Sequence, residues 1–151
     1  MAVPKVTTWI LVADGARARL LVNEGPGKGI RPLEAHENPH MHDRTRDLGT
    51  ERPGRVQESA NAARHSMEPR VDWHTWEKHL FAKGLAESLN AAAAAGKFDR
   101  LVLVAPPHIL GELRVALNKK VREKISGEIN KDLTHMPDRD LLAPLGDVLA
   151  V

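Results

Sequence analysis

Arginine and histidine side chains that could bind an anion gather in the middle of the chain. Arg55 and the adjacent pair Arg64 and His65 lie in a polar tract that runs from residue 37 to about residue 71. Arginine presents a planar fork of N–H donors to phosphate or carboxylate, so these three residues form a candidate anion site. Residues 43–72 carry six arginines and six acidic side chains, and a solvated loop with internal salt bridges is the alternative.

A second group of basic residues follows near residue 120. Only Glu112 and Glu123 oppose it, and its members are Arg114, Lys119, Lys120, Arg122 and Lys124. Such a stretch is usually the solvated face of a helix, and the functional interpretation is contact with a phosphate backbone. The aromatic content of 3% argues against recognition of single strands by base stacking. Trp73 and Trp76 are expected to pack in the core instead.

The patterns that could bind a metal are weak. One histidine-rich group lacks any spacing diagnostic of zinc, and it consists of His36, His40, His42 and Asp43. Asp14 ends the first predicted strand, as the metal-binding acid of a nuclease would, yet it belongs to an Asp-Gly turn and the fourth strand has no acid. We therefore predict no metal site and no cofactor.

Nucleophilic catalysis has equally little support. Ser59, His65 and Glu68 can be combined into a triad, but no nucleophile elbow surrounds the serine. The enzymatic alternative is a hydrolase of esters or phosphoesters that uses Arg55, Gln57 and His65. The sequence favours a non-enzymatic protein and identifies no catalytic residue.

The hydrophobic pattern predicts the elements that would position these residues. Apolar and β-branched runs predict five strands, and Pro32 implies that the third is an edge strand or begins just after this proline. The strands are expected at 7–13, 16–22, 30–36, 100–105 and 126–133. Helices are expected at 72–95, from Pro107 along the stripe Leu110, Leu113, Leu117 and Val121, and from Pro137 to Leu142, where Pro144 ends or kinks the helix.

The predicted order, β-β-β-α-β-α-β-α, indicates an α/β fold. Three antiparallel strands followed by two units of helix and parallel strand give a mixed five-stranded sheet with helices on both faces, which is the ribonuclease H-like arrangement. A chain of 151 residues fits one domain, so we expect a single domain with a long irregular loop at about 37–71. A short helix within 58–67 could interrupt that loop.

Composition restricts the function further. The chain has no cysteine, which excludes a disulfide framework and a thiolate nucleophile. The N-terminus lacks a secretory signal and no stretch approaches roughly 20 apolar residues, so we expect a cytoplasmic protein without a membrane partner. The net charge of +2 is small, and only local clusters could bind a polyanion.

Several stretches resemble the bacterial host-attachment protein family, described as proteins required for attachment to host cells. They are residues 9–20, Gly54-Arg55 with Ser59 and Arg64-His65, Phe81-Ala82, residues 101–107, Leu110-Gly111, Leu113-Arg114, and residues 130–134. The resemblance covers nearly the whole chain in one order. It implies a role in attachment without a mechanism, and for a cytoplasmic protein that role would be indirect.

The expected fold also resembles the middle domain of archaeal and eukaryotic peptide-chain release factors. That domain carries a Gly-Gly-Gln loop followed by a basic helix. The comparable residues 53–59 here lack the tripeptide, and Gln57 is not in its place. The resemblance therefore does not extend to release-type hydrolysis, but it is compatible with contact with RNA or the ribosome.

Together these patterns predict a protein that binds an anionic partner, with RNA or the ribosome as the candidates. The predicted contacts are the loop at 44–70 and the helix at 114–124. A hydrolase, and a scaffold that forms a homodimer through an exposed sheet edge, remain the alternatives.

Overall fold

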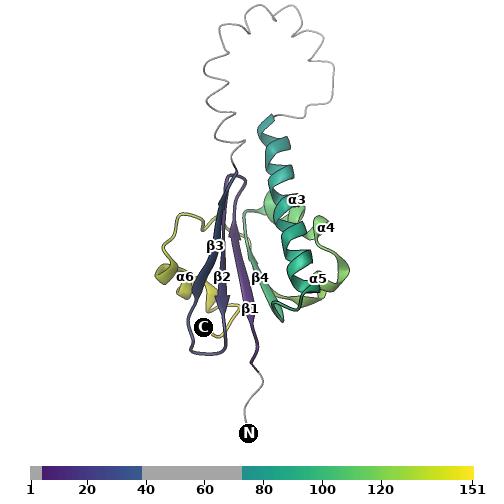
Figure 1. The fold of residues 1–151 in the computed structure, drawn as a ribbon. Helices are drawn as coiled ribbons and strands as arrows, with labels where there is room; N and C mark the ends of the chain where they lie inside the picture. The colour runs from purple at the N-terminus through teal and green to yellow at the C-terminus, as the bar shows by residue number, and fades with distance from the viewer. Residues whose placement is uncertain (1–4, 39–72) are drawn as a thin grey trace, which may run out of the picture.

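A mixed five-stranded sheet forms the centre of the protein (Figure 1). The computed structural model describes residues 5–38 and 73–151. The strands are β1 (Thr8–Ala13), β2 (Arg17–Asn23), β3 (Arg31–Glu37), β4 (Arg100–Val104) and β5 (Ile125–Ile129), in the order β3-β2-β1-β4-β5. The first three strands are antiparallel, and β4 is parallel to both β1 and β5. This topology confirms the predicted ribonuclease H-like fold.

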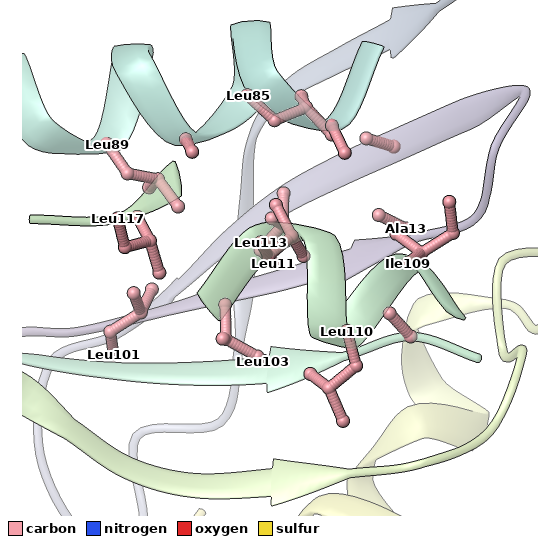
Figure 2. Packing of buried hydrophobic residues seen from close by; sticks show 14 of the residues in the cluster. Leu11, Ala13, Leu85, Leu89, Leu101, Leu103, Ile109, Leu110, Leu113 and Leu117 are labelled. Carbon is pink, nitrogen blue, oxygen red and sulfur yellow. The ribbon is translucent and has the colours of Figure 1, made fainter. Parts of the chain in front are cut away.

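Helices cover both faces of the sheet, as predicted (Figure 1). One face carries α3 (Trp73–Ala94), α4 (Pro107–Ala116) and α5 (Lys119–Lys124), and the other carries α6 (Asp138–Leu145). Alternate residues of a strand point to opposite faces. Leu11 and Leu103 therefore join the core cluster that contains residues of α3 and α4 (Figure 2), whereas Val12 joins the cluster of α6.

The strand β4 shows why the sequence predicted a parallel strand covered on both sides. Its residues from Leu101 to Val104 are all fully buried, and their side chains divide between the two core clusters. A strand that can bury both faces reads as a continuous apolar run. In contrast, all seven residues of β3 are exposed, and Pro32 is accommodated there because β3 is the edge strand.

The predicted basic helix is interrupted. Leu117 adopts an extended conformation after α4, and the side-chain oxygen of Asn118 accepts a hydrogen bond of 3.0 Å from the N–H of Val121. Asparagine competes with the helical backbone and caps a new helix at this point. The predicted apolar stripe is buried nevertheless, and it comprises Leu110, Leu113, Leu117 and Val121.

Two tryptophans lie elsewhere than predicted. Trp73 is 50% exposed and Trp76 is 45% exposed, so the expectation that they pack in the core is wrong. The helix α3 turns the face with Ala82, Leu85 and Leu89 toward the sheet, and this face does not include the two indole rings. Trp76 stacks on His79 at the helix surface, with ring centroids 5.4 Å apart.

Smaller differences concern the C-terminal elements. The last strand ends at Ile129 rather than at residue 133, and α6 continues to Leu145, one residue past Pro144. The predicted helix within 58–67 and nearly all of the predicted loop lie outside the described residues. In the described parts of the chain, no helix has both the length and the apolar character needed to cross a membrane.

Candidate functional site

The predicted anion site in the loop lies outside the described residues. This applies to Arg55, Arg64 and His65, and also to the candidate hydrolase residue Gln57. Their convergence therefore stays a prediction. The same holds for the candidate triad and for most of the histidine-rich group, of which only His36 is described; His36 lies on β3 and pairs with Glu34 at 2.8 Å.

The residues that flank this segment lie at the carboxyl edge of the parallel strands. The Asn38 side chain donates hydrogen bonds to the carbonyl oxygens of Gly15 (3.3 Å) and Glu77 (3.2 Å). Its backbone N–H donates to the carbonyl oxygen of Ala16 at 2.7 Å. The end of β3 is thus bonded to the β1–β2 turn and to the first turns of α3, which begins at Trp73.

The predicted basic helix lies at the opposite, amino edge of the sheet (Figure 1). α5 leads directly into the first residue of β5, and Val121 fastens it to the core with a fully buried side chain. Lys119, Lys120 and Arg122 are exposed and Lys124 is half-buried. The described flanks of the loop and the basic helix are therefore at different ends of the parallel strands.

The basic residues of this region fall into two classes. The lysines of α5 form no ion pair with an acidic group in the described parts of the chain, and Glu123 is the single acid of that helix. Arg114 instead forms two hydrogen bonds with the carboxylate of Glu128, one of them 3.0 Å long between Nε and Oε2. This carboxylate raises the pKa of Arg114. The lysines are therefore the charges available to a partner.

A polar corner at the carboxyl edge was not predicted as a unit. Asp14 directly follows β1, and its Oδ1 accepts hydrogen bonds from the backbone N–H groups of Ala16 (2.7 Å) and Arg17 (2.8 Å). The hydroxyl of Thr134 lies 3.0 Å from Oδ2 of Asp14 and 2.6 Å from Oδ1 of Asp132. The corner thus joins the β1–β2 turn to the segment that follows β5.

Hydrogen bonds, charge and burial compete at Asp132. Burial raises the pKa of the Asp132 carboxyl, but hydrogen bonds from the Thr134 hydroxyl and N–H, the nearby charge of His135, and a hydrogen bond with Asp14 outweigh it and leave the pKa lowered. The ligand atoms of Asp14, Asp132 and His135 lie within 4.8 Å of one another, so they could hold a cation. We assign none, because donors already bind both oxygens of Asp14 and Oδ1 of Asp132.

Arg19 fastens the same C-terminal segment to β2. Its Nη1 donates to Oδ1 of Asp138 at 2.7 Å, and its Nη2 donates to the carbonyl oxygens of Leu133 (3.3 Å) and Met136 (2.5 Å). A half-buried guanidinium with three acceptors in one short segment acts as a structural clamp. It positions the turn that carries Thr134.

The sequence matches a known family along most of its length. The family described as "Protein required for attachment to host cells" matches residues 9–145. The chain belongs to this family. The resemblance noted in the sequence is thereby confirmed, and no curated protein matches the chain.

Solved structures show distant similarity to the host-attachment protein. The archaeal translation termination factor aRF1 has a TM-score of 0.47 and 10% identity, and it covers 93% of this chain and 39% of its own. The PPX-GPPA enzyme of Aquifex aeolicus has a TM-score of 0.42 and 12% identity, and covers 83% of this chain and 36% of its own. The chain therefore spans less than half the length of either protein.

Three of the stretches that resemble the host-attachment family meet at the carboxyl edge. The β1–β2 turn contains Asp14, Ala105 directly follows β4, and the segment after β5 contains Thr134. Thr134 bonds to Asp14, and the N–H of Ala105 donates to the carbonyl oxygen of Ile129 at 3.0 Å. No sequence spacing links residues separated by 120 positions, so only the fold shows this arrangement.

Proposed function

We propose that this host-attachment family member binds a polyanion, with RNA as the first candidate, through the lysines of α5. One observation supports the proposal above others. Lys119 and Lys120 are exposed, and neither they nor Lys124 face an acidic partner among the described residues, whereas Glu128 already pairs with Arg114. Arg122 adds a fourth positive charge to the same short helix.

Lysines on a short helix suit a phosphate backbone better than a specific base sequence. α5 carries four basic residues and one acidic residue, so its net charge is positive. Phosphate contacts by lysine supply sequence-independent affinity that falls steeply with salt. The exposed rings of Trp73 and Trp76 lie on the first turns of α3, at the other end of the sheet, and are not placed to stack bases beside α5.

The loop is the second proposed contact with the polyanion. Arg55, Arg64 and His65 stay the predicted anion-binding residues of that segment. Because the described flanks of the loop and α5 lie at opposite edges of the sheet, the two groups are tested with separate variants.

Co-sedimentation with ribosomes from a cell lysate, at low and high salt, tests the proposal. The variant Lys119→Gln/Lys120→Gln/Lys124→Gln removes the charges and keeps residues that favour a helix. The matched control, Lys28→Gln/Lys83→Gln/Lys131→Gln, removes the same charge from exposed lysines elsewhere. Arg55→Ala/Arg64→Ala tests the loop.

We expect the wild type and the control to sediment with ribosomes at low salt and to be released at high salt. The α5 variant should stay in the supernatant at both. If the wild type does not sediment at low salt, the ribosome is not the partner. If the α5 variant sediments like the wild type, α5 is not the contact.

A further inference from the structure

A pocket of about 460 Å³ opens between α3 and the end of β3. Its apolar wall includes Leu80, Phe81 and Leu85, and its polar wall includes Glu77 and Ser88. This volume lies within the range of small-molecule sites, roughly 300–1,000 Å³, and a mostly apolar wall with a few polar groups is typical of such sites. The pocket is lined by residues of the edge strand β3, and none of its lining residues belongs to α5.

The carboxyl group of Glu77 is the unusual feature of this wall. Glu77 is 5% exposed, and its Oε2 atom is buried without a hydrogen-bond partner among the described residues. A buried carboxylate oxygen that lacks a donor is unfavourable. No described lysine or arginine forms an ion pair with Glu77, although Lys78 follows it directly in the chain. Glu77 lines the pocket, and no described donor would have to be displaced from its Oε2 atom by a ligand.

A glycine in the middle of α3 keeps the pocket open. Gly84 lines the pocket, and a Cβ atom added there would meet no atom within 4 Å. Glycine weakens a helix interior relative to alanine, and no close packing among the described residues requires it at this position. The missing side chain leaves space beside Phe81 and Ser88, as expected if a ligand occupies that space.

We propose that this pocket binds a small organic cation. An ammonium group would donate to the carboxylate of Glu77, and an apolar body of about the size of a benzene ring would pack against Leu80, Phe81 and Leu85. A ligand of this charge is opposite in sign to the polyanion proposed for α5. The two proposals concern different residues and different ligands, so the failure of one does not affect the other.

Phenethylamine is the probe, because it joins one ammonium group to one aromatic ring. The full-length protein is titrated with phenethylamine and, separately, with the neutral analogue phenethyl alcohol, and binding is followed by the shifts of backbone amide resonances in NMR spectra. Three variants are compared with the wild type. Glu77→Gln removes the charge, Gly84→Leu fills the pocket, and Gly111→Leu places the same side chain at a helical glycine of α4 that also has open space.

We expect phenethylamine to bind with millimolar or better affinity and to shift the resonances of Glu77, Gly84 and Ser88. Loss of a charge-assisted hydrogen bond should weaken binding about 10- to 100-fold in Glu77→Gln and for phenethyl alcohol. Gly84→Leu should abolish binding, and Gly111→Leu should leave it unchanged. Absence of phenethylamine binding to the wild type overturns the proposal, and so does equal binding of the amine and the alcohol or of wild type and Glu77→Gln. Folding of each variant is checked by its amide spectrum before titration.

Discussion

Arg114 of α4 and Glu128 of β5 form a two-bonded ion pair across the face of the sheet that α4 covers. The pair joins two elements that are adjacent in the fold. The basic residues from 114 to 124 look uniform in the sequence, but they differ in the structure. Arg114 forms an ion pair with an acidic residue of the protein, and the lysines of α5 form none among the described residues. This difference generates the first prediction.

Replacement of Glu128 by glutamine should strengthen polyanion binding. The change releases the guanidinium of Arg114 next to α5, where the Nη1 of Arg122 already donates to the Arg114 carbonyl oxygen at 3.4 Å. One more phosphate contact should steepen the dependence of log affinity on log salt by about 0.7. Fluorescence anisotropy with a labelled single-stranded RNA measures this slope. An unchanged slope would show that Arg114 lies away from the bound phosphates.

Thr134→Val should destabilise the protein by about 1–3 kcal/mol, because it removes the hydroxyl donor shared by two carboxylates and keeps the shape of the side chain. Thr134 is 6% exposed, so water cannot easily replace that donor. Urea unfolding measures the loss. The control is Thr75→Val on the exposed side of α3, for which a change within about 0.5 kcal/mol is expected. If the two substitutions change the free energy of unfolding equally, the hydroxyl of Thr134 does not stabilise the fold.

The lowered pKa of Asp132 predicts a stability loss on the acid side. The ordinary value is 3.8, and the folded value lies below it. The contribution of Asp132 is therefore fully present well above 3.8 and is lost as the pH falls through the folded pKa. The stability of the wild type should fall more than that of Asp132→Asn between about pH 5 and about pH 3. Urea unfolding at each pH measures the free energy of unfolding. The same pH dependence in the wild type and in Asp132→Asn would contradict the lowered pKa of Asp132.

Two glycines should respond to alanine in opposite directions. A Cβ atom at Gly127 of β5 would lie 2.7 Å from the Cβ of Val148, which is attached directly to the backbone and cannot turn away. Gly127→Ala should cost about 1–3 kcal/mol from overpacking. Gly84→Ala has open space and should gain about 0.5–1 kcal/mol in helix stability. Thermal unfolding ranks the two variants, and a stabilised Gly127→Ala would show that the C-terminal segment is not packed on β5.

The sequence predicted those parts of the fold that depend on local pattern. The apolar run of β4 indicates a strand that is buried on both faces, and the proline of β3 indicates an edge strand. The sheet has both features. The prediction that the tryptophans of α3 are buried was wrong because their spacing fits a buried stripe as well as an exposed one. In the folded protein the face of α3 with the leucines packs on the sheet instead. The capping role of Asn118 was readable in principle, since asparagine favours helix starts, but the apolar stripe continues across it.

In the candidate sites, too, the sequence shows the local features but not the contacts between distant segments. The charge of α5 is visible in the sequence, whereas the pairing of Arg114 with Glu128 depends on which element lies beside α4. Asp14 and Thr134 are 120 positions apart, and the buried carboxyl of Glu77 occupies a position that reads as an ordinary exposed helix residue. Contacts between distant segments are set by the topology, so no local pattern contains them.

The most direct test of the central claim is the salt dependence of RNA affinity for the wild type, Lys119→Gln/Lys120→Gln/Lys124→Gln and its matched control. Three lost phosphate contacts should reduce the slope of log affinity against log salt by about 2, and the control should keep the slope of the wild type. The same slope in the α5 variant and the wild type would contradict the claim that these lysines form the polyanion contact.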